Sequence, residues 1–202
     1  AGGPEAMFHT LEGVEDSAES AEVDLQKVNL NKKDIVIGIA ASGATPYTVA
    51  ALRYAKQVGA LAIAVACVTD SPLEKNADVA ICPIVGPEVI TGATLMKAGT
   101  SQKMVLNMVS SGIMIRSGKV YQNLMINVVP TNEKTNRRAK RIIAAATQTS
   151  TLAAERALDR ADNNVPLAIL LIETKGTIAE AKALLKQAGG HVSDAVKLSL
   201  QS

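Results

Sequence analysis

The stretch with the clearest chemical potential is residues 34–47, DIVIGIAASGATPY. An apolar run passes into Ser42 and Gly43, and Thr45 and Pro46 then precede a segment with apolar residues at helical spacing. Thr45 is suited to the N-cap of that helix and Pro46 to its first position, where a missing N–H costs nothing. Such a turn directs backbone N–H groups and the positive helix end at one point, which favours an anion such as phosphate. Ser42 adds a hydroxyl, and Gly43 lets the backbone approach a ligand closely.

An ordinary strand-to-helix turn is the alternative interpretation of the same stretch. The pattern is shorter than a P-loop and lacks the lysine of that motif. Both interpretations stay open from this stretch alone.

Three further sets of polar residues could take part in chemistry. Glu15 and Asp16 follow Gly13 near an expected turn, within an acidic segment whose other carboxylates are expected to be solvated. Residues 69–71 form a short polar segment, and residues 86–100 form a loop rich in Gly and Thr. Within that loop, Lys97 is a single cation. It either contacts a phosphate or carboxylate or is simply exposed to solvent, and both interpretations stay open.

The order of elements predicts an α/β fold with a parallel sheet flanked by helices. We expect a strand over 35–41, a helix over 46–58, and strands over 61–68 and 79–85, with the first strand buried. Residues 1–3 are expected to be the end of a strand that leaves the sheet. Ligands of such sheets bind beyond the carboxyl ends of the strands, which predicts a site among residues 42–45, 69–71 and 86–97.

The second half of the chain is expected to be mainly helical. A long helix follows the loop, and its face from Met104 to Ile113 is interpreted as core or subunit interface. A helix over 132–147 carries a basic cluster, which we interpret as an exposed face because no aromatic residues are interleaved for base stacking. After residue 149 short helices follow, with Ser150 and Thr177 as caps. We therefore expect domains at 1–149 and 150–202, the second a small helical bundle.

Composition excludes several classes of protein. The chain has 202 residues, of which 48% are hydrophobic but only 2% aromatic, so Ala, Val, Ile, Leu and Met must form the core. A net charge of +2 gives no strong field for nucleic acid or a membrane surface. No apolar run is long enough to span a bilayer and no signal peptide is apparent, so a cytoplasmic location is expected. Cys67 and Cys82 lie in expected buried strands and are interpreted as core residues, not a disulfide or a metal site.

Several segments, taken in order, resemble one known family. They are GIAASGATPYTVAALRYAKQVGA, IVGPEVITGATLMKAGTSQKMVLNM, GKVYQNLMINVVPTNEK and LDRADNNVPLAILLIETKGTIAEAKALLKQAGGHV. The family is that of the N-acetylmuramic acid 6-phosphate etherases, within the sugar-isomerase (SIS) class of phosphosugar-binding folds. The resemblance implies an SIS-type domain over 1–149 and a UBA-like helical domain over 150–202.

The resemblance also implies a reaction, which cleaves the ether between D-lactate and C3 of the phosphorylated amino sugar in peptidoglycan recycling. It needs an acid–base pair of carboxylates and no metal or cofactor. The segment EGVED resembles the EGAED of the family and places Glu15 at a catalytic glutamate, more specifically the one that acts at C2. Ser42, Gly43 and Thr45 are expected to contact the substrate, with Glu88, Thr91 and Lys97 as weaker candidates.

Some features depart from the family. Ala44 and Leu95 stand where Arg is usual, and the family carries an additional N-terminal portion with a first strand, a phosphate loop and a second catalytic glutamate. The resemblance therefore implies that these 202 residues alone are weakly active or inactive. A homodimer is expected from the apolar face at 104–113 and the helical bundle. A noncatalytic phosphosugar sensor, like the related glucokinase regulatory protein, and a phosphosugar isomerase are the alternatives.

Overall fold

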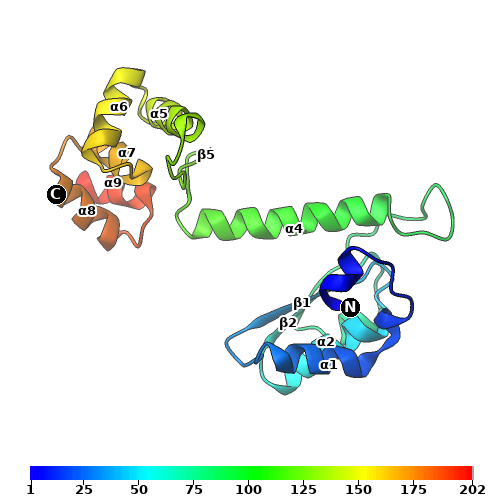
Figure 1. Ribbon diagram of the computed structural model, residues 1–202. Helices are drawn as coiled ribbons and strands as arrows, with labels where there is room; N and C mark the ends of the chain where they lie inside the picture. Colours follow the sequence, from blue (N-terminus) through cyan, green and yellow to red (C-terminus); the bar gives the residue numbers. More distant parts are fainter. Residues whose placement is uncertain (202) are drawn as a thin grey trace. The chain divides into compact units, whose positions relative to one another are not determined.

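The computed structural model describes residues 1–201, which form two compact units, Ala1–Asn107 and the part from Met108 onward (Figure 1). Helix α4 (Lys97–Arg116) contains the point of division. The elements before it are η1 (Gly3–Met7), η2 (Val14–Asp16), α1 (Ala18–Lys27), β1 (Ile35–Ile39), α2 (Pro46–Gln57), β2 (Leu61–Val65), α3 (Pro72–Lys75) and β3 (Val79–Ile81). The elements after it are β4 (Val120–Tyr121), β5 (Leu124–Met125), α5 (Glu133–Thr147), α6 (Thr151–Arg160), α7 (Val165–Thr174), α8 (Ile178–Gln187) and α9 (Val192–Ser199).

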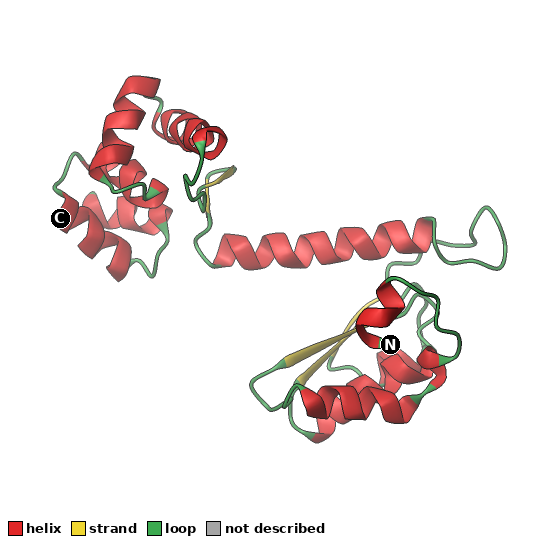
Figure 2. Cartoon of the chain, viewed as in Figure 1, coloured by secondary structure: helices red, strands yellow, loops and turns green. Residues whose placement is uncertain are grey.

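The first unit is built on a parallel sheet in the order β1-β2-β3, which confirms the predicted α/β class. Ile35 pairs with Leu61, and Ile63 pairs with Val79. Helix α2 packs against β1 and β2, and α1 packs in turn on α2 (Figure 2). The carboxyl ends of all three strands therefore lie at one edge, where the candidate loops begin.

The core between α2 and the sheet consists mainly of small side chains. Ala55, Ala62 and Ala64 are fully buried there, together with the larger Leu52 and Leu73. A Cβ at Gly38 of β1 would stand 3.0 Å from Leu52 Cγ, so α2 lies close over the first strand. This close packing follows from the alanine-rich composition.

The prediction that the first strand is buried is only half right, because helices cover one face of it. Gly38 points toward α2, whereas Ile35, Ile37 and Ile39 point away and are 58%, 38% and 40% exposed. Leu61 and Val79 are exposed on the neighbouring strands. Side chains alternate across a strand, so a helix on one side leaves the other set of isoleucines uncovered.

The N-terminal prediction is wrong: residues 1–3 do not end a strand but lead into the 3₁₀ helix η1. Gly2 and Gly3 have φ of 82° and 64°, in the left-handed region that a strand does not use. Pro4 then lies at the start of η1, where its fixed φ is compatible with a helix.

Helix α4 confirms the predicted long helix but not a buried methionine face. Only Ala98 and Val105 are buried along it, whereas Met104, Met108 and Ile113 are more than half exposed. The methionines of α4 therefore belong to none of the hydrophobic cores of residues 1–201.

The second unit has its own core, formed by α5 to α9 and the β4–β5 hairpin. Ile126, Ile143, Leu158 and Leu170 are at most 1% exposed within it. Asn132 and Thr177 form capping boxes at the starts of α5 and α8, and Ser150 caps α6 as predicted. Helix α5 shares this core with α6 and α7, so the predicted boundary at 149–150 lies inside the second unit.

Candidate functional site at the carboxyl edge of the sheet

The loop after β1 makes the predicted tight turn into α2. Gly43 has φ of 65° and its N–H donates to Ala40 O at 2.9 Å, while the N–H of Ala44 donates to Ser42 Oγ at 3.3 Å. Two of the backbone donors that the sequence offered to an anion are therefore used inside the turn. Pro46 occupies the first helical position as predicted.

The first turn of α2 keeps its remaining donors available. Thr45 is the N-cap residue, but its side chain accepts no hydrogen bond from the helix. The N–H groups of Tyr47 and Thr48 consequently have no capping partner, and they carry the positive end of the helix dipole. The donors that remain available to an anion are thus at the helix start and on the exposed Ser42 hydroxyl, more than on the loop amides.

The loop after β2 lies against the loop after β1, as the topology predicts. The N–H of Leu73 donates to Gly43 O at 2.9 Å, and the N–H of Cys67 donates to Ala41 O at 2.9 Å. Ser71 is buried, and its Oγ accepts from Glu74 N at 3.2 Å to cap α3. The segment 69–71 therefore supports the first loop, with Ser71 serving a structural role.

The loop that opens α4 reaches the same edge through Cys67. The Sγ of Cys67 lies 3.4 Å from Ser101 Oγ, which in turn donates to Ala98 O at 2.8 Å. Cys67 is buried but lies after β2, and Cys82 is half-buried after β3; both thiols are free. The structure thus brings the loops after β1 and β2 and the first turn of α4 into contact within the first unit.

The carboxylate of Glu88, a predicted ligand contact, is bonded instead to the start of α4. Its Oε2 accepts from Lys97 N at 2.9 Å and its Oε1 accepts from Ala98 N at 3.0 Å. These backbone N–H groups, that of Lys97 first, lower the pKa of Glu88 below its ordinary value. The carboxylate therefore occupies the N-terminus of α4, where a bound anion would otherwise lie.

Thr91 and Lys97, the weaker candidates, are both exposed in this loop. The Nζ of Lys97 lies near Gly86, because a Cβ added to that glycine would stand 3.9 Å from it. Leu95, in the place of a usual Arg, is 81% exposed, and Ala44 is exposed as well.

Glu15 lies in η2, directly after Gly13, whose φ of 76° forms the predicted turn. Its side chain is exposed and makes no hydrogen bond or ion pair within residues 1–201. Helix η2 packs against α2, the helix that begins at the candidate anion site. The structure thus brings the segment with Glu15 to the helix whose start is the candidate anion site.

A cleft of about 700 Å³, which was not predicted, is lined by Gly13 and Val14, the residues directly before Glu15, although Glu15 itself does not line it. Gly2, Gly13, Ser17, Ser20 and Asp24 are among the residues that line it. The available signal was the combination of left-handed glycines with two serines one helical turn apart, a pattern too common to single out.

A hydrogen bond links this cleft to the start of α2. The hydroxyl of Tyr47 donates to Asp24 Oδ2 at 3.0 Å. Desolvation, followed by this bond, raises the pKa of Tyr47, while the pKa of Asp24 is lowered by its bonds to Lys27 and then to Tyr47. Within residues 1–201 no group of three His, Cys, Asp or Glu side chains is arranged to hold a metal ion.

Together these features define a parallel α/β protein with an uncapped helix start at the carboxyl edge of the sheet, and with an exposed carboxylate and a cleft in the N-terminal segment that packs on that helix. The chain matches the SIS domain over residues 6–111. It therefore belongs to the SIS domain family.

Curated relatives extend the comparison to the whole chain. The chain is 68% identical over 199 residues to an N-acetylmuramic acid 6-phosphate etherase of Levilactobacillus brevis, an alignment that covers 98% of this chain and 66% of the relative. It is 53% identical over 197 residues to a protein of the same name from Lactobacillus acidophilus, with 98% and 66% covered. For the one from Caldanaerobacter subterraneus the identity is 49% over 198 residues, with 98% and 65% covered. The chain thus spans about two thirds of the length of these relatives.

Proposed function

We propose that this chain is part of an etherase that acts on N-acetylmuramic acid 6-phosphate, releasing D-lactate and N-acetylglucosamine 6-phosphate in peptidoglycan recycling. The observation that carries the proposal is the 68% identity, over 98% of the chain, to a relative named as that etherase. A phosphorylated amino sugar also suits a member of the SIS domain family with an uncapped helix start and with an exposed carboxylate on the segment that packs against that helix.

The phosphate of the substrate is the group best suited to the start of α2. A dianionic phosphate accepts hydrogen bonds from the N–H groups of Tyr47 and Thr48 and from the hydroxyls of Ser42 and Thr45. The left-handed Gly43 keeps the loop compact and leaves room for the phosphate to approach. Ala44 supplies no charge, so in this proposal helix dipole and hydrogen bonds hold the phosphate.

The elimination step needs a base at C2 of the open-chain aldehyde and an acid at the leaving oxygen. We assign Glu15 the proton transfer at C2: its carboxylate takes the C2 proton, the electron pair forms the C2–C3 double bond, and the C3–O bond breaks. The leaving lactate oxygen receives a proton from a second acid. Water then gives one proton to the conjugate base of the second acid and adds its hydroxyl to C3, while Glu15 returns its proton to C2, which restores both groups.

The exposed position of Glu15 supports this role, since no other residue of the described chain holds its carboxylate. The cleft lined by the preceding residues Gly13 and Val14 offers Ser17 and Ser20 as hydroxyl contacts for the sugar chain or the lactyl group. Lys97 and Thr91 remain free for the substrate, whereas Glu88 would have to leave α4 to contact it.

We also propose that the protein is a homodimer and that it is cytoplasmic. The exposed Met104, Met108 and Ile113 of α4 form an apolar surface that a second copy would cover. Within residues 1–201 no helix is both long and apolar enough to cross a membrane.

The test compares this chain with what we call the completed protein. In the completed protein the chain is joined to the remaining third that its longer relatives contain. We expect the completed protein to release D-lactate from N-acetylmuramic acid 6-phosphate and the 202-residue chain to release little. Saturable binding of the sugar phosphate without lactate would indicate a noncatalytic sensor instead. A ketose phosphate detected by NMR would indicate an isomerase.

A further inference from the structure

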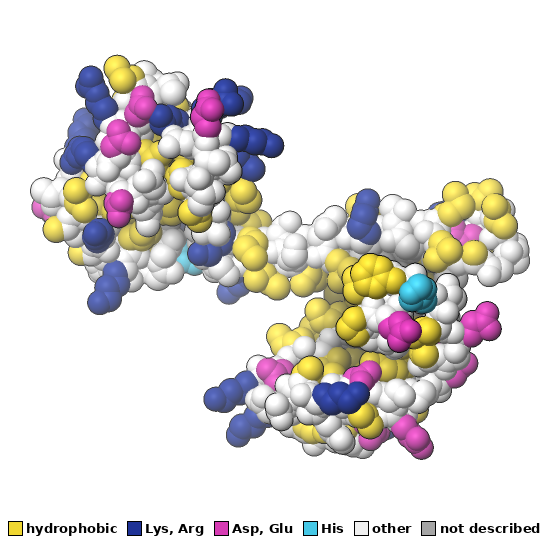
Figure 3. Space-filling view, in the orientation of Figure 1, with side chains coloured by type: hydrophobic (Ala, Val, Ile, Leu, Met, Phe, Trp, Pro, Cys, Tyr) yellow, Lys and Arg dark blue, Asp and Glu magenta, His cyan; other side chains and the backbone are white. Residues whose placement is uncertain are grey.

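The small net charge of the chain hides a strong asymmetry between its two units. The total of +2 divides into 12 Asp and Glu against 8 Lys and Arg in residues 1–107, and 7 against 13 in residues 108–202. The first unit thus carries −4 and the second +6. Figure 3 shows Lys and Arg side chains distributed widely over the unit that contains α5.

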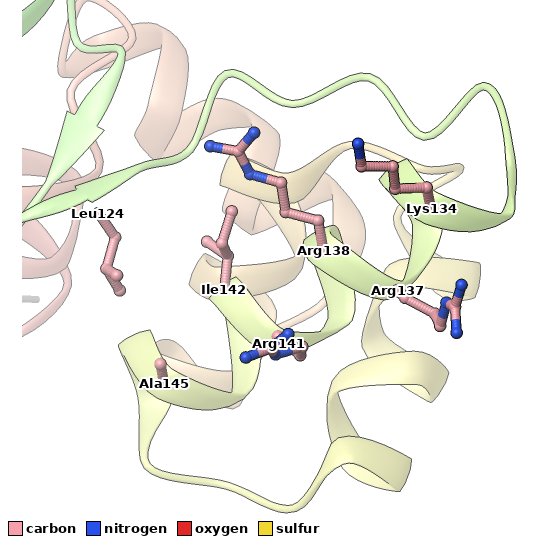
Figure 4. Close-up of a pocket in the computed structure, with 7 residues that line it drawn as sticks. All are labelled: Leu124, Lys134, Arg137, Arg138, Arg141, Ile142 and Ala145. Atoms are coloured by element: carbon pink, nitrogen blue, oxygen red, sulfur yellow. The ribbon is translucent and has the colours of Figure 1, made fainter.

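Four of the 13 Lys and Arg residues of the second unit lie on one face of α5, which we call the basic face: Lys134, Arg137, Arg138 and Arg141. It borders an open groove of about 700 Å³ whose apolar part is formed by Leu124, Ile142 and Ala145 (Figure 4). Arg137 is 3.8 Å from Glu133 of the same helix. Within residues 1–201 the other three cations have no ion pair.

The arrangement of these side chains suits an extended acidic surface better than a small anion. In Figure 4 the side chains of Arg137 and Arg138 leave α5 in different directions, and Lys134 lies a turn away, so they do not converge on one point. No aromatic residue lines the groove to stack against a nucleic-acid base. The expected occupant is therefore a protein segment with spaced carboxylates.

The chain itself carries such a segment, which we call the acidic strip: Glu12, Glu15, Asp16, Glu19 and Glu22. None of these carboxylates makes an ion pair or hydrogen bond within residues 1–201, and no Lys or Arg precedes Lys27. Glu15, Glu19 and Glu22 follow one another at intervals of four and three residues. Lys134, Arg138 and Arg141 have the same two intervals with the opposite sign.

We infer that the basic face of α5 docks on the acidic strip of a second copy of this chain. Two-fold symmetry would form this contact twice in a dimer, each copy giving its basic face and receiving its partner's. Opposite potentials of this kind steer association and fix the register of the two copies. Arg138 and Arg141 would face Glu19 and Glu22 of the partner, whereas Lys134 would lie beside Glu15 at the open end of the contact, where substrate still reaches the carboxylate. The choice of a second copy as the partner rests on the proposed homodimer. The test below measures only the association of the copies and not catalysis.

The experiment uses two charge-reversed variants of the chain. One is Arg138→Glu with Arg141→Glu, and the other is Glu19→Lys with Glu22→Lys, which leaves Glu15 unchanged. Each variant alone faces like charges in both contacts, so sedimentation should show its dimer dissociation constant raised about tenfold or more. Mixing the two variants puts opposite charges back into both contacts, so the mixture should recover dimers. Salt at 1 M should weaken the wild-type dimer, because the screening length falls to about 3 Å.

Controls separate this effect from net charge and from misfolding. Lys182→Glu with Lys186→Glu changes the charge by the same amount on the exposed side of α8 and should leave the dimer intact. Circular dichroism should show wild-type helix content in every variant. A wild-type dimer that both reversals leave unchanged, or a loss that mixing does not restore, would overturn the contact and leave the homodimer standing. A monomeric wild type at high concentration would overturn both.

Discussion

The backbone of Gly43 lies directly against Ser71: a Cβ at position 43 would stand 2.4 Å from both Cβ and Oγ of Ser71. Ser71 cannot retreat, because it is buried and its hydroxyl caps α3. The loop after β1, which leads to the proposed phosphate site, is therefore fixed by the loop after β2.

Gly43→Ala is expected to lower the free energy of unfolding by about 2–4 kcal/mol, because alanine adds left-handed backbone strain to overpacking against Ser71. Urea unfolding measures the change. Gly99→Ala is the matched control, since Gly99 lies in α4 with nothing within 4 Å of its added carbon, and it should be neutral or slightly stabilising. Equal stabilities for the two variants would contradict the close contact.

Tyr47→Phe should raise the pKa of Asp24. The Tyr47 hydroxyl donates to Asp24 Oδ2 at 3.0 Å and is the second cause of the lowered pKa, after the bond to Lys27. The pKa of Asp24 should therefore move only part of the way to its ordinary value. NMR titration of the Asp24 carboxyl carbon tests this, with Tyr54→Phe as a control on the same helix. An unchanged titration would show that the hydrogen bond does not form in solution.

Protonation of the Glu88 carboxylate in acid should make the first unit less stable. Its folded pKa is depressed by the N–H groups of Lys97 and Ala98, so its stabilising effect is present above its ordinary pKa of 4.5 and is lost as the pH falls through the folded value. Glu88→Gln should remove that part of the pH dependence. Unfolding followed from pH 7 to pH 3 measures it, beside Glu5→Gln, whose carboxylate makes no such bonds. Identical pH profiles for wild type and Glu88→Gln would be the contrary result.

Leu170→Ala should destabilise the second unit by about 2–5 kcal/mol, because Leu170 is fully buried in the core formed by α5 to α9. Leu152→Ala removes the same atoms from a side chain that is 56% exposed and should cost far less. Thermal unfolding by calorimetry compares the two. A small effect of Leu170→Ala would mean that this core is loosely packed.

The strand–turn–helix pattern of residues 34–57 was predictable, because Ile35 to Ile39, Gly43 and Pro46 act through local propensity. The adjacency of the candidate loops also followed, since parallel strands place their carboxyl ends together. The capping role of Glu88 was not predictable, because it joins residues nine and ten positions apart through a loop of no regular pattern. The exposure of Ile37 and Met108 was also not predictable, because it depends on whether another element packs over them and not on the residue type. Gly2 and Gly3 were misassigned because a strand end and a left-handed turn are both compatible with glycine.

The proposed function depends above all on Glu15 moving the proton at C2 in an etherase reaction. The decisive quantity is the kcat for D-lactate release by the completed protein carrying Glu15→Gln, beside Glu5→Gln as a matched exposed glutamate outside the acidic strip. We predict that kcat falls about 10²–10⁴-fold for Glu15→Gln and stays near wild type for Glu5→Gln. A Glu15→Gln protein that turns over at the wild-type rate would refute the assigned role of Glu15.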